Sequence, residues 1–433
     1  MSRQDLADAL NAHLARTDPQ EATFDANHIG KLERGLHRWP NSKRRAAFRH
    51  VLRVAADQEL GFYVIRGMHD AVSSTSRGDE GDVDRTDERG AVPLHDRQRR
   101  ALLKGIAGLA AAAGLTGPRD AVRRRRIGRT DLARLDAVTA MYRSLDYECG
   151  GGQLYPHVNA FAASVAAMVD DDYPDRLRSG LLAAIAGARQ LAGWTAFDAG
   201  RHLDAQRHWL AAERAAVEAG DFRLAARVRY CQARQFQHLR HNRDAVDTLG
   251  LATAQLGSAS TPAIAAMLLG SEAASRAALG DACGALAALT AAEGAFARMD
   301  REREPDWMRF YDRGELLAQY GRVYRDLARA DPHTHGETAV RWVSEAISAF
   351  GTQDVRSTVL NEVGLCSAWS LAGHPEEALA AGMVVIGHAG QVSSARVLDR
   401  IRNLRRDLAR HMTRPDVAEF SRRLADAGTA STS

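Results

Sequence analysis

Small apolar residues recur at a regular interval through the C-terminal two thirds of the sequence. Ala205, Ala245 and Ala285 are separated by 40 residues each. A bulky residue follows each of them after four positions and another alanine after seven, which places all three side chains on one face of a helix. A small residue also lies twelve positions before each of these three alanines, and twelve before Ala378, which occupies the same place in a later repeat. These small residues are Gly193, Ala233, Ala273 and Cys366. The pattern predicts helical hairpins whose two helices approach closely at the small residues.

The same pattern predicts an all-α protein with several parts. Residues 70–96 interrupt it, because they are rich in Ser, Gly and acidic side chains and cannot bury enough apolar surface to become ordered. The predicted organisation is a helix-turn-helix head at residues 1–60, a flexible acidic linker at 61–96, a basic helical connector at 97–134, an α-solenoid at 135–427 and a disordered tail at 428–433.

One step in the alanine register, the step after Ala285, is 54 residues long. The extra length predicts an insertion at Arg301–Asp306 or at Asp331–Gly336. His333 and His335 fall in the second of these segments. With no further ligand spaced nearby, they are expected in a surface loop rather than at a metal.

Three helix starts can be identified in the first 53 residues. Ser2 and Asp5 have the spacing of a capping box. Asp25 can cap a second, short helix, and Ser42 can begin a third one after Pro40 stops the chain from continuing as a helix. The third helix is strongly basic. Two short helices followed by a basic one are typical of a DNA-binding domain.

The strings Ser2–Ala7 and Ile29–Gly35 resemble the XRE family of helix-turn-helix repressors. The resemblance implies that the helix near residues 26–34 reads the major groove of double-stranded DNA while basic residues around it hold phosphates. The implied base-facing residues are Ala26, Asn27, His28 and Lys31, and the implied phosphate contacts are Gln4, Arg34, Arg38, Lys43, Arg44 and Arg45. Alternatively, these basic residues form an ordinary solvated face. The family has one more helix before the Ser2 helix, and the printed sequence offers no counterpart for it.

The C-terminal repeat is similar to the tetratricopeptide repeat, whose usual period is 34 residues. The segments Tyr147–Gly152 and Leu191–His202 look like those of actinobacterial regulators that join an XRE domain to tetratricopeptide-like repeats. This resemblance implies a cytoplasmic transcriptional regulator, expected to be a homodimer, whose repeat domain binds a peptide, small-molecule or protein effector. The alternative is a tetratricopeptide-like interaction scaffold whose truncated head does not bind DNA.

Aromatic residues at helical spacing are candidates for an effector groove, although such residues also form ordinary cores. The candidates are Trp194, Phe197, Phe236, Tyr320, Tyr324 and Trp369. No catalytic motif accompanies them, and Gly150–Gly152 is expected to form a flexible turn. We therefore expect no enzyme activity, no cofactor and no metal.

Composition adds three constraints. The 58 basic and 54 acidic residues exclude a wholesale polycation, so any nucleic-acid site must be local. Arginine supplies 55 of the 58, which we interpret as coding bias. The four cysteines are too far apart for a CxxC motif, and no apolar run approaches the ~18 residues needed to span a bilayer. We therefore expect a reducing compartment and no membrane partner.

Overall fold

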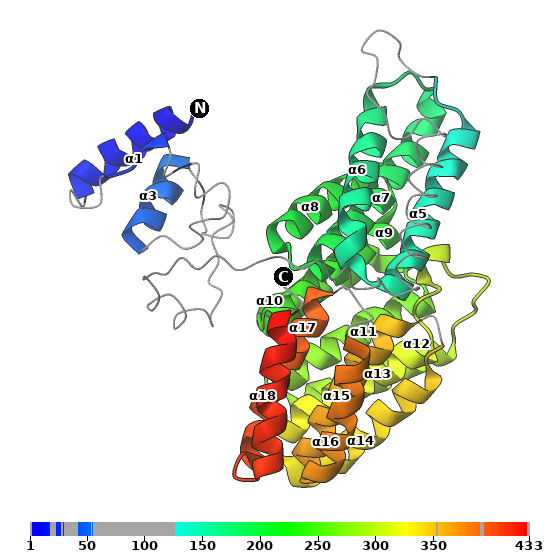
Figure 1. Ribbon diagram of the computed structural model, residues 1–433. Helices are drawn as coiled ribbons and strands as arrows, with labels where there is room; N and C mark the ends of the chain where they lie inside the picture. Colours follow the sequence, from blue (N-terminus) through cyan, green and yellow to red (C-terminus); the bar gives the residue numbers. More distant parts are fainter. Residues whose placement is uncertain are drawn as a thin grey trace, which may run out of the picture. The chain divides into compact units, whose positions relative to one another are not determined.

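The computed structural model describes residues 2–17, 23–26, 29, 42–52, 54, 126–351, 354–389 and 394–430. The chain divides into two compact units, at residues 1–89 and 90–433. We call the described parts of these units the head (residues 2–54) and the repeat domain (residues 126–430), and each is described by itself (Figure 1). The described residues form helices and turns without a β-strand, which confirms the all-α class. The predicted linker and residues 97–125 of the predicted connector lie outside the described ranges.

Two helices, α1 (Arg3–Thr17) and α3 (Ser42–Leu52), build the head. The predicted capping box is present at the start of α1, where the Ser2 amide donates to Asp5 Oδ2 (2.8 Å) and the Asp5 amide donates to Ser2 Oγ (3.1 Å). These two bonds satisfy amides that the first helical turn leaves without a partner. The predicted third helix is also confirmed, and it begins at Ser42 as expected.

The core of the head lies between α1 and α3. Leu10 and Leu14 of α1 are buried together with Phe48 of α3. Asn11 fixes the intervening chain, because its side-chain amide donates to the Phe24 carbonyl (2.7 Å) and its oxygen accepts from the Phe24 amide (2.9 Å). Ile29 is also buried, and its amide bonds the carbonyl of residue 25 (3.1 Å), as in the first turn of the predicted second helix.

The repeat domain consists of helices arranged as successive antiparallel hairpins (Figure 1). They are α5 (Arg129–Cys149), α6 (Gly151–Ala166), α7 (Arg178–Asp198), α8 (His202–Ala219), α9 (Phe222–His238), α10 (Asn242–Leu256), α11 (Pro262–Ala278), α12 (Ala282–Ala297), α13 (Arg313–Ala330), α14 (Pro332–Ala349), α15 (Val355–Ala372), α16 (Pro375–Ala389), α17 (Ala395–Leu408) and α18 (Pro415–Ala430). Short 3₁₀ segments occur at Ala167–Asp170, Asp175–Leu177, Gly257–Ala259, Asp306–Met308 and Ala409–His411. Because α18 runs to Ala430, the first three residues of the predicted tail are helical.

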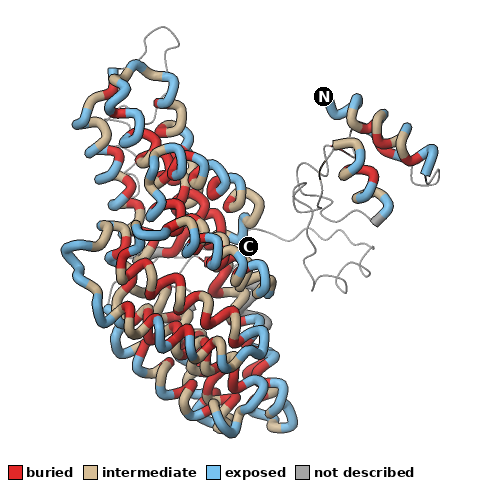
Figure 2. The backbone as a smooth tube through the Cα atoms, turned by 180° about the vertical axis from the view of Figure 1, so that it is seen from behind, coloured by how far each residue is buried: buried red, intermediate tan, exposed pale blue. Residues whose placement is uncertain are grey.

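The predicted alanine register is confirmed in this arrangement. Ala205, Ala245 and Ala285 lie near the starts of α8, α10 and α12, and all three are fully buried. At the small position twelve residues earlier, a Cβ atom added to Gly193 would lie 2.4 Å from the ring of Trp209. The glycine thus makes room for the bulky residue of the same hairpin. Figure 2 shows how such buried positions follow the helix contacts of the domain, with exposed positions on its outer turns.

Local polar residues explain why the helices begin where they do. The carboxylates of Asp221, Asp281, Asp312 and Asp331 each accept a hydrogen bond from the amide three residues further on, at 2.8–3.1 Å. These contacts are N-caps of α9, α12, α13 and α14. Each therefore marks the boundary between two helices of the array.

The inserted segment lies between α12 and α13, at residues 298–312, which is the first of the two predicted places. It is held by Tyr311, which is fully buried and whose hydroxyl donates to the Ala266 carbonyl (3.0 Å). The expectation of a loop around His333 and His335 was wrong. Pro332 opens α14, so both histidines lie in its first turn, after the Asp331 cap.

From α7 onward, the helices that begin the hairpins form a closed inner ring. These helices, α7, α9, α11, α13, α15 and α17, each contact the next, and α17 contacts α7 again. Helix α5 packs against both α7 and α15. Within the described residues, no helix is both long enough and apolar enough to cross a membrane.

Candidate functional site

The inner helices surround a polar cavity of about 1270 Å³, a volume that includes its opening to solvent. Its wall comes from α5, α7, α9, α13, α15 and α17 together with Phe310 of the inserted segment. A second cavity of about 830 Å³ adjoins the first, and the two share five residues. The shared residues are Gln237, His238, Arg322, Arg325 and Arg400.

The walls of the two cavities carry a large excess of positive charge. Eleven arginines line them, against five aspartate and glutamate residues. The arginines recur on the inner faces of their helices at helical spacing, as in Arg227 and Arg234 of α9 or Arg396 and Arg400 of α17. The interpretation of the arginines as coding bias was therefore incomplete, because the fold gathers many of them in one place.

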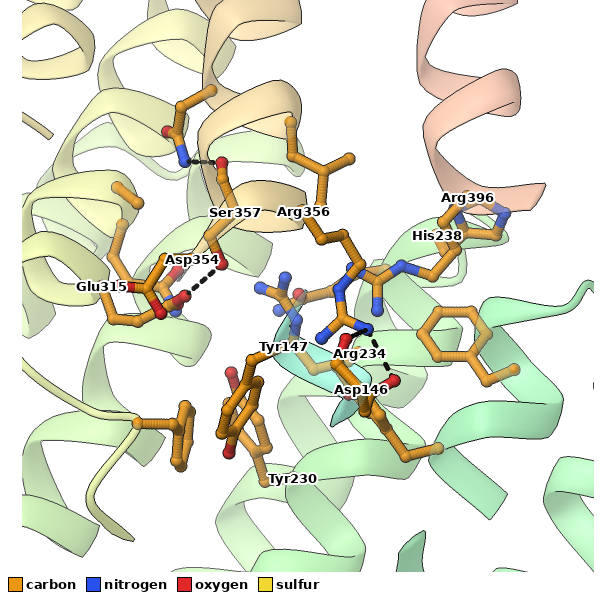
Figure 3. Close-up of a pocket in the computed structure, with 18 of the residues that line it drawn as sticks. Asp146, Tyr147, Tyr230, Arg234, His238, Glu315, Asp354, Arg356, Ser357 and Arg396 are labelled. Carbon is orange, nitrogen blue, oxygen red and sulfur yellow. Dashed lines mark hydrogen bonds and ion pairs between the residues drawn. The ribbon is translucent and has the colours of Figure 1, made fainter. Parts of the chain in front are cut away.

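Three charged residues of the wall and one behind it neutralise one another and close the ring; we call Asp146, Arg356, Arg396 and the buried Asp198 the clasp. Figure 3 shows Asp146, Arg356 and Arg396. Arg356 Nη1 lies 2.7 Å from Asp146 Oδ1 and 3.5 Å from Asp198 Oδ2, and Arg396 Nε lies 3.5 Å from Asp198 Oδ1. All four side chains are buried. Burial alone would lower the pKa of Arg356, but Asp146 and Asp198 raise it above its ordinary value. The clasp thus joins α5, α7, α15 and α17.

Asp198 also explains why Gly150–Gly152 is not the expected flexible turn. Gly150 has a positive φ of 80° and separates α5 from α6. The buried amide of Gly151 donates to Asp198 Oδ2 (2.7 Å), and Ser394 Oγ donates to Asp198 Oδ1 (2.8 Å). A Cβ atom at Gly151 would approach Asp198 to 2.8 Å. The glycines are therefore a packed junction between helices.

Four other arginines have no such compensation; we call Arg234, Arg322, Arg325 and Arg400 the arginine cluster. In the described part of the chain, none of their guanidinium groups lies within 4.0 Å of a carboxylate. Arg322 Nη1 donates to Gln237 Oε1 (2.8 Å), whereas Arg234 Nη1 and Arg325 Nε are buried without a hydrogen-bond partner among the residues that the structure describes.

The electrostatics of the cluster reflect this lack of partners. Burial, together with the charges of Arg325 and Arg234, lowers the pKa of Arg400 to about 9. Burial and the charges of Arg234 and Arg400 lower the pKa of Arg322 well below its ordinary range. Each cation therefore makes it less favourable for the others to carry a charge in the folded protein.

An aromatic wall bounds the first cavity on the side of α5 and α9. It contains Tyr147, Tyr230 and Phe310, and the guanidinium of Arg227 lies 3.9 Å from the centre of the Phe310 ring. The Tyr147 hydroxyl is buried without a hydrogen-bond partner among the described residues. This wall offers planar surfaces beside polar groups.

The predicted effector residues divide into two groups. Trp194 and Phe197 line the first cavity, where Trp194 Nε1 donates to Asp146 Oδ2 (3.0 Å) and the Arg396 guanidinium lies over the Trp194 ring (4.8 Å). The others pack between helices and are not part of either cavity wall: Phe236, Tyr320, Tyr324 and Trp369.

The structure places half of the residues predicted to contact DNA. Gln4 is exposed in the first turn of α1 and donates to Asp8 Oδ1 (2.9 Å). Ala26 is half-buried, and Lys43, Arg44 and Arg45 lie in the first turn of α3. Arg44 donates to Thr23 Oγ1 (2.8 Å) and lies over the Phe24 ring (4.9 Å), so it also stabilises the head. Outside the described residues are Asn27, His28, Lys31, Arg34 and Arg38.

Comparisons with known proteins add no assignment. No family model matches the sequence, and no curated protein matches it significantly. Among the described residues, no group of three or more His, Cys, Asp and Glu side chains is placed to hold a metal. The fold and the cavities therefore define an all-helical protein with a repeat-like array around an arginine-rich cavity.

Proposed function

We propose that this protein is a transcriptional regulator in which a ligand held by the repeat domain controls DNA binding by the head. One observation carries the proposal: the inner helices of successive hairpins enclose a polar cavity whose wall is assembled from α5, α7, α9, α13, α15 and α17. A ligand that contacts several repeats at once favours one arrangement of the array over others. Ligand occupancy can therefore change the conformation of the whole domain.

The composition of the head supports the DNA-binding part of the proposal. Its described helices carry the capping box and the basic first turn of α3, and its sequence resembles XRE domains. Lys43 is exposed in that turn, where the helix N-terminus adds to the attraction for phosphate. We further infer a homodimer, since helix-turn-helix regulators commonly bind two half-sites.

The position of the cavities supports a small effector, because side chains on the inner helices of the array line both of them. A cavity inside a ring of helices suits a small molecule or a short peptide better than a folded protein.

Selection of genomic fragments by the full chain tests this function. We expect the wild type to enrich a small set of fragments. The double substitution Asn27→Ala and Lys31→Ala should abolish enrichment, because it removes the implied base contacts. The matched control is Arg422→Ala, which removes one charge from α18 at a side chain that is 73% exposed.

Two outcomes would contradict the proposal. The first is that the wild type enriches no fragment at low salt. The second is that both variants bind as the wild type does, since DNA would then be held by nonspecific charge alone. Stable capture of a protein partner without any enriched DNA would favour the interaction scaffold.

A further inference from the structure

We propose that the cavity of the repeat domain binds a compact anion with two or more phosphoryl groups, and that the arginine cluster holds it. The identity of the anion deepens the proposed function, and only its effect on DNA depends on that function. Binding of the anion itself rests on the repeat domain alone.

The arginine cluster brings together side chains from three hairpins. Arg234 lies on α9, Arg322 and Arg325 lie one helical turn apart on α13, and Arg400 lies on α17. Three of the four line both cavities, so the cluster lies where the cavities meet. Gly364 of α15 makes room for it, because a Cβ atom there would come too close to Arg325 Nη1.

The nearby carboxylates are occupied elsewhere. Asp146 and Asp198 belong to the clasp. Glu315 accepts a hydrogen bond from Ser357 Oγ (2.9 Å; Figure 3). Arg329 binds both Asp407 (2.8 Å) and Asp326. Asp326 is the carboxylate whose charge favours the charged forms of Arg322, Arg325 and Arg400. The cluster thus keeps an excess of positive charge that the described residues do not balance.

Such an arrangement is costly unless an anion completes it. Burying a cation without a partner costs several kcal/mol. The side chain of Arg325 is only 6% exposed, and its Nε has no hydrogen-bond partner in the described structure. Arg325 lines both cavities, and an unsatisfied donor in a cavity wall is a group for a ligand to bind. The fold therefore retains these cations at the expense of stability, which is typical of functional sites.

Charge and geometry favour phosphoryl groups. Arginine forms paired hydrogen bonds with the oxygens of phosphate. A terminal phosphoryl group carries about 1.5–2 negative charges at pH 7, so two linked groups offset most of the four guanidinium charges within a small volume. Tyr147, Tyr230 and Phe310 line the first cavity and offer planar surfaces to an organic remainder of the anion.

Titration calorimetry of the full chain without DNA tests the proposal, with inorganic pyrophosphate and adenosine diphosphate as probes. Orthophosphate, citrate and adenosine are the comparison ligands. At constant ionic strength, we expect both probes to bind at least tenfold more tightly than any comparison ligand. Arg322→Gln and Arg400→Gln should each weaken both probes at least tenfold, and the exposed control Arg422→Gln should bind them as the wild type does.

The melting temperature of the ligand-free protein separates a binding role from a structural one. Removal of an unbalanced cation should leave the melting temperature of each cluster variant unchanged or raise it. The proposal is overturned if citrate binds as well as pyrophosphate, if no probe binds, or if both cluster variants melt at a lower temperature and still bind the probes. Because no DNA is present, none of these results depends on whether the head binds an operator.

Discussion

Replacing Arg400 by glutamine is expected to stabilise the protein in the absence of a ligand. Burial near Arg325 and Arg234 lowers the pKa of Arg400 to about 9. Each pKa unit corresponds to about 1.4 kcal/mol, so a charged guanidinium at this site costs the fold roughly 5 kcal/mol at pH 7. Glutamine removes the charge but still buries a polar group. We therefore expect the free energy of unfolding to rise by about 1–2 kcal/mol and the melting temperature by roughly 2–6 °C.

The pH dependence of this gain has a definite sign. Below pH 9, Arg400 is charged in both the folded and the unfolded chain, so the full cost is present and the gain is constant. As the pH rises through about 9, the folded protein releases this proton more readily than the unfolded chain, and the gain shrinks.

Urea unfolding followed by circular dichroism measures this gain. The control is Arg422→Gln, whose exposed site should change the stability by less than about 0.5 kcal/mol. A clear loss of stability in Arg400→Gln, with the control unchanged, would refute the reasoning, because Arg400 would then have a stabilising partner in the fold.

Three further predictions concern the scaffold around the cavity. Asp198→Asn should lower the free energy of unfolding by about 3–5 kcal/mol in urea titrations, because it leaves the buried arginines of the clasp without their partner; an effect below 1 kcal/mol would show that the clasp does not hold the ring. Gly193→Ala should destabilise the protein by about 1–3 kcal/mol, because the added methyl group overlaps the ring of Trp209. Gly187→Ala on the same helix, where the added Cβ meets nothing within 4 Å, should stabilise it by about 0.5–1 kcal/mol. If the melting temperatures of the two variants change in the same direction, Gly193 is not required by its contact with Trp209. Burial and the charge of a neighbouring arginine lower the pKa of His208 to about 4, so the free energy of unfolding falls by about 3 kcal/mol as the pH drops from 6.5 to 4. His208→Gln should remove this loss when urea titrations at pH 7 and pH 4.5 are compared. The prediction fails if the variant and the wild type lose the same stability between the two pH values.

Periodicity was sufficient to predict the helices and the repeat. Ala205, Ala245 and Ala285 could be predicted as buried because a spacing of 40 residues with partners at plus four and plus seven reflects the contacts of one hairpin. The capping box of Ser2 could likewise be predicted, because an N-cap depends only on residues close in the sequence. Such features can be predicted because residues close together in the sequence determine them.

The cavity could be predicted only in part, because it depends on contacts between distant helices. Trp194 and Phe197 were candidates on aromatic character alone, and they do lie on the wall. The arginine cluster was missed, since Arg234, Arg322 and Arg400 are up to 166 residues apart in the sequence. Arginines recur at helical spacing on the first helix of several hairpins, as at Arg396 and Arg400. This pattern was the signal in the sequence that could have indicated the arginine cluster.

The central claim is that an anion in the repeat domain controls DNA binding by the head. It is tested most directly by the fluorescence anisotropy of a labelled fragment, chosen from those the full chain enriches, titrated with the protein at constant ionic strength with and without saturating pyrophosphate. We predict that pyrophosphate shifts the dissociation constant at least fivefold for the wild type and leaves that of Arg400→Gln unchanged. Equal dissociation constants with and without pyrophosphate for a wild-type protein that binds the anion would contradict the claim.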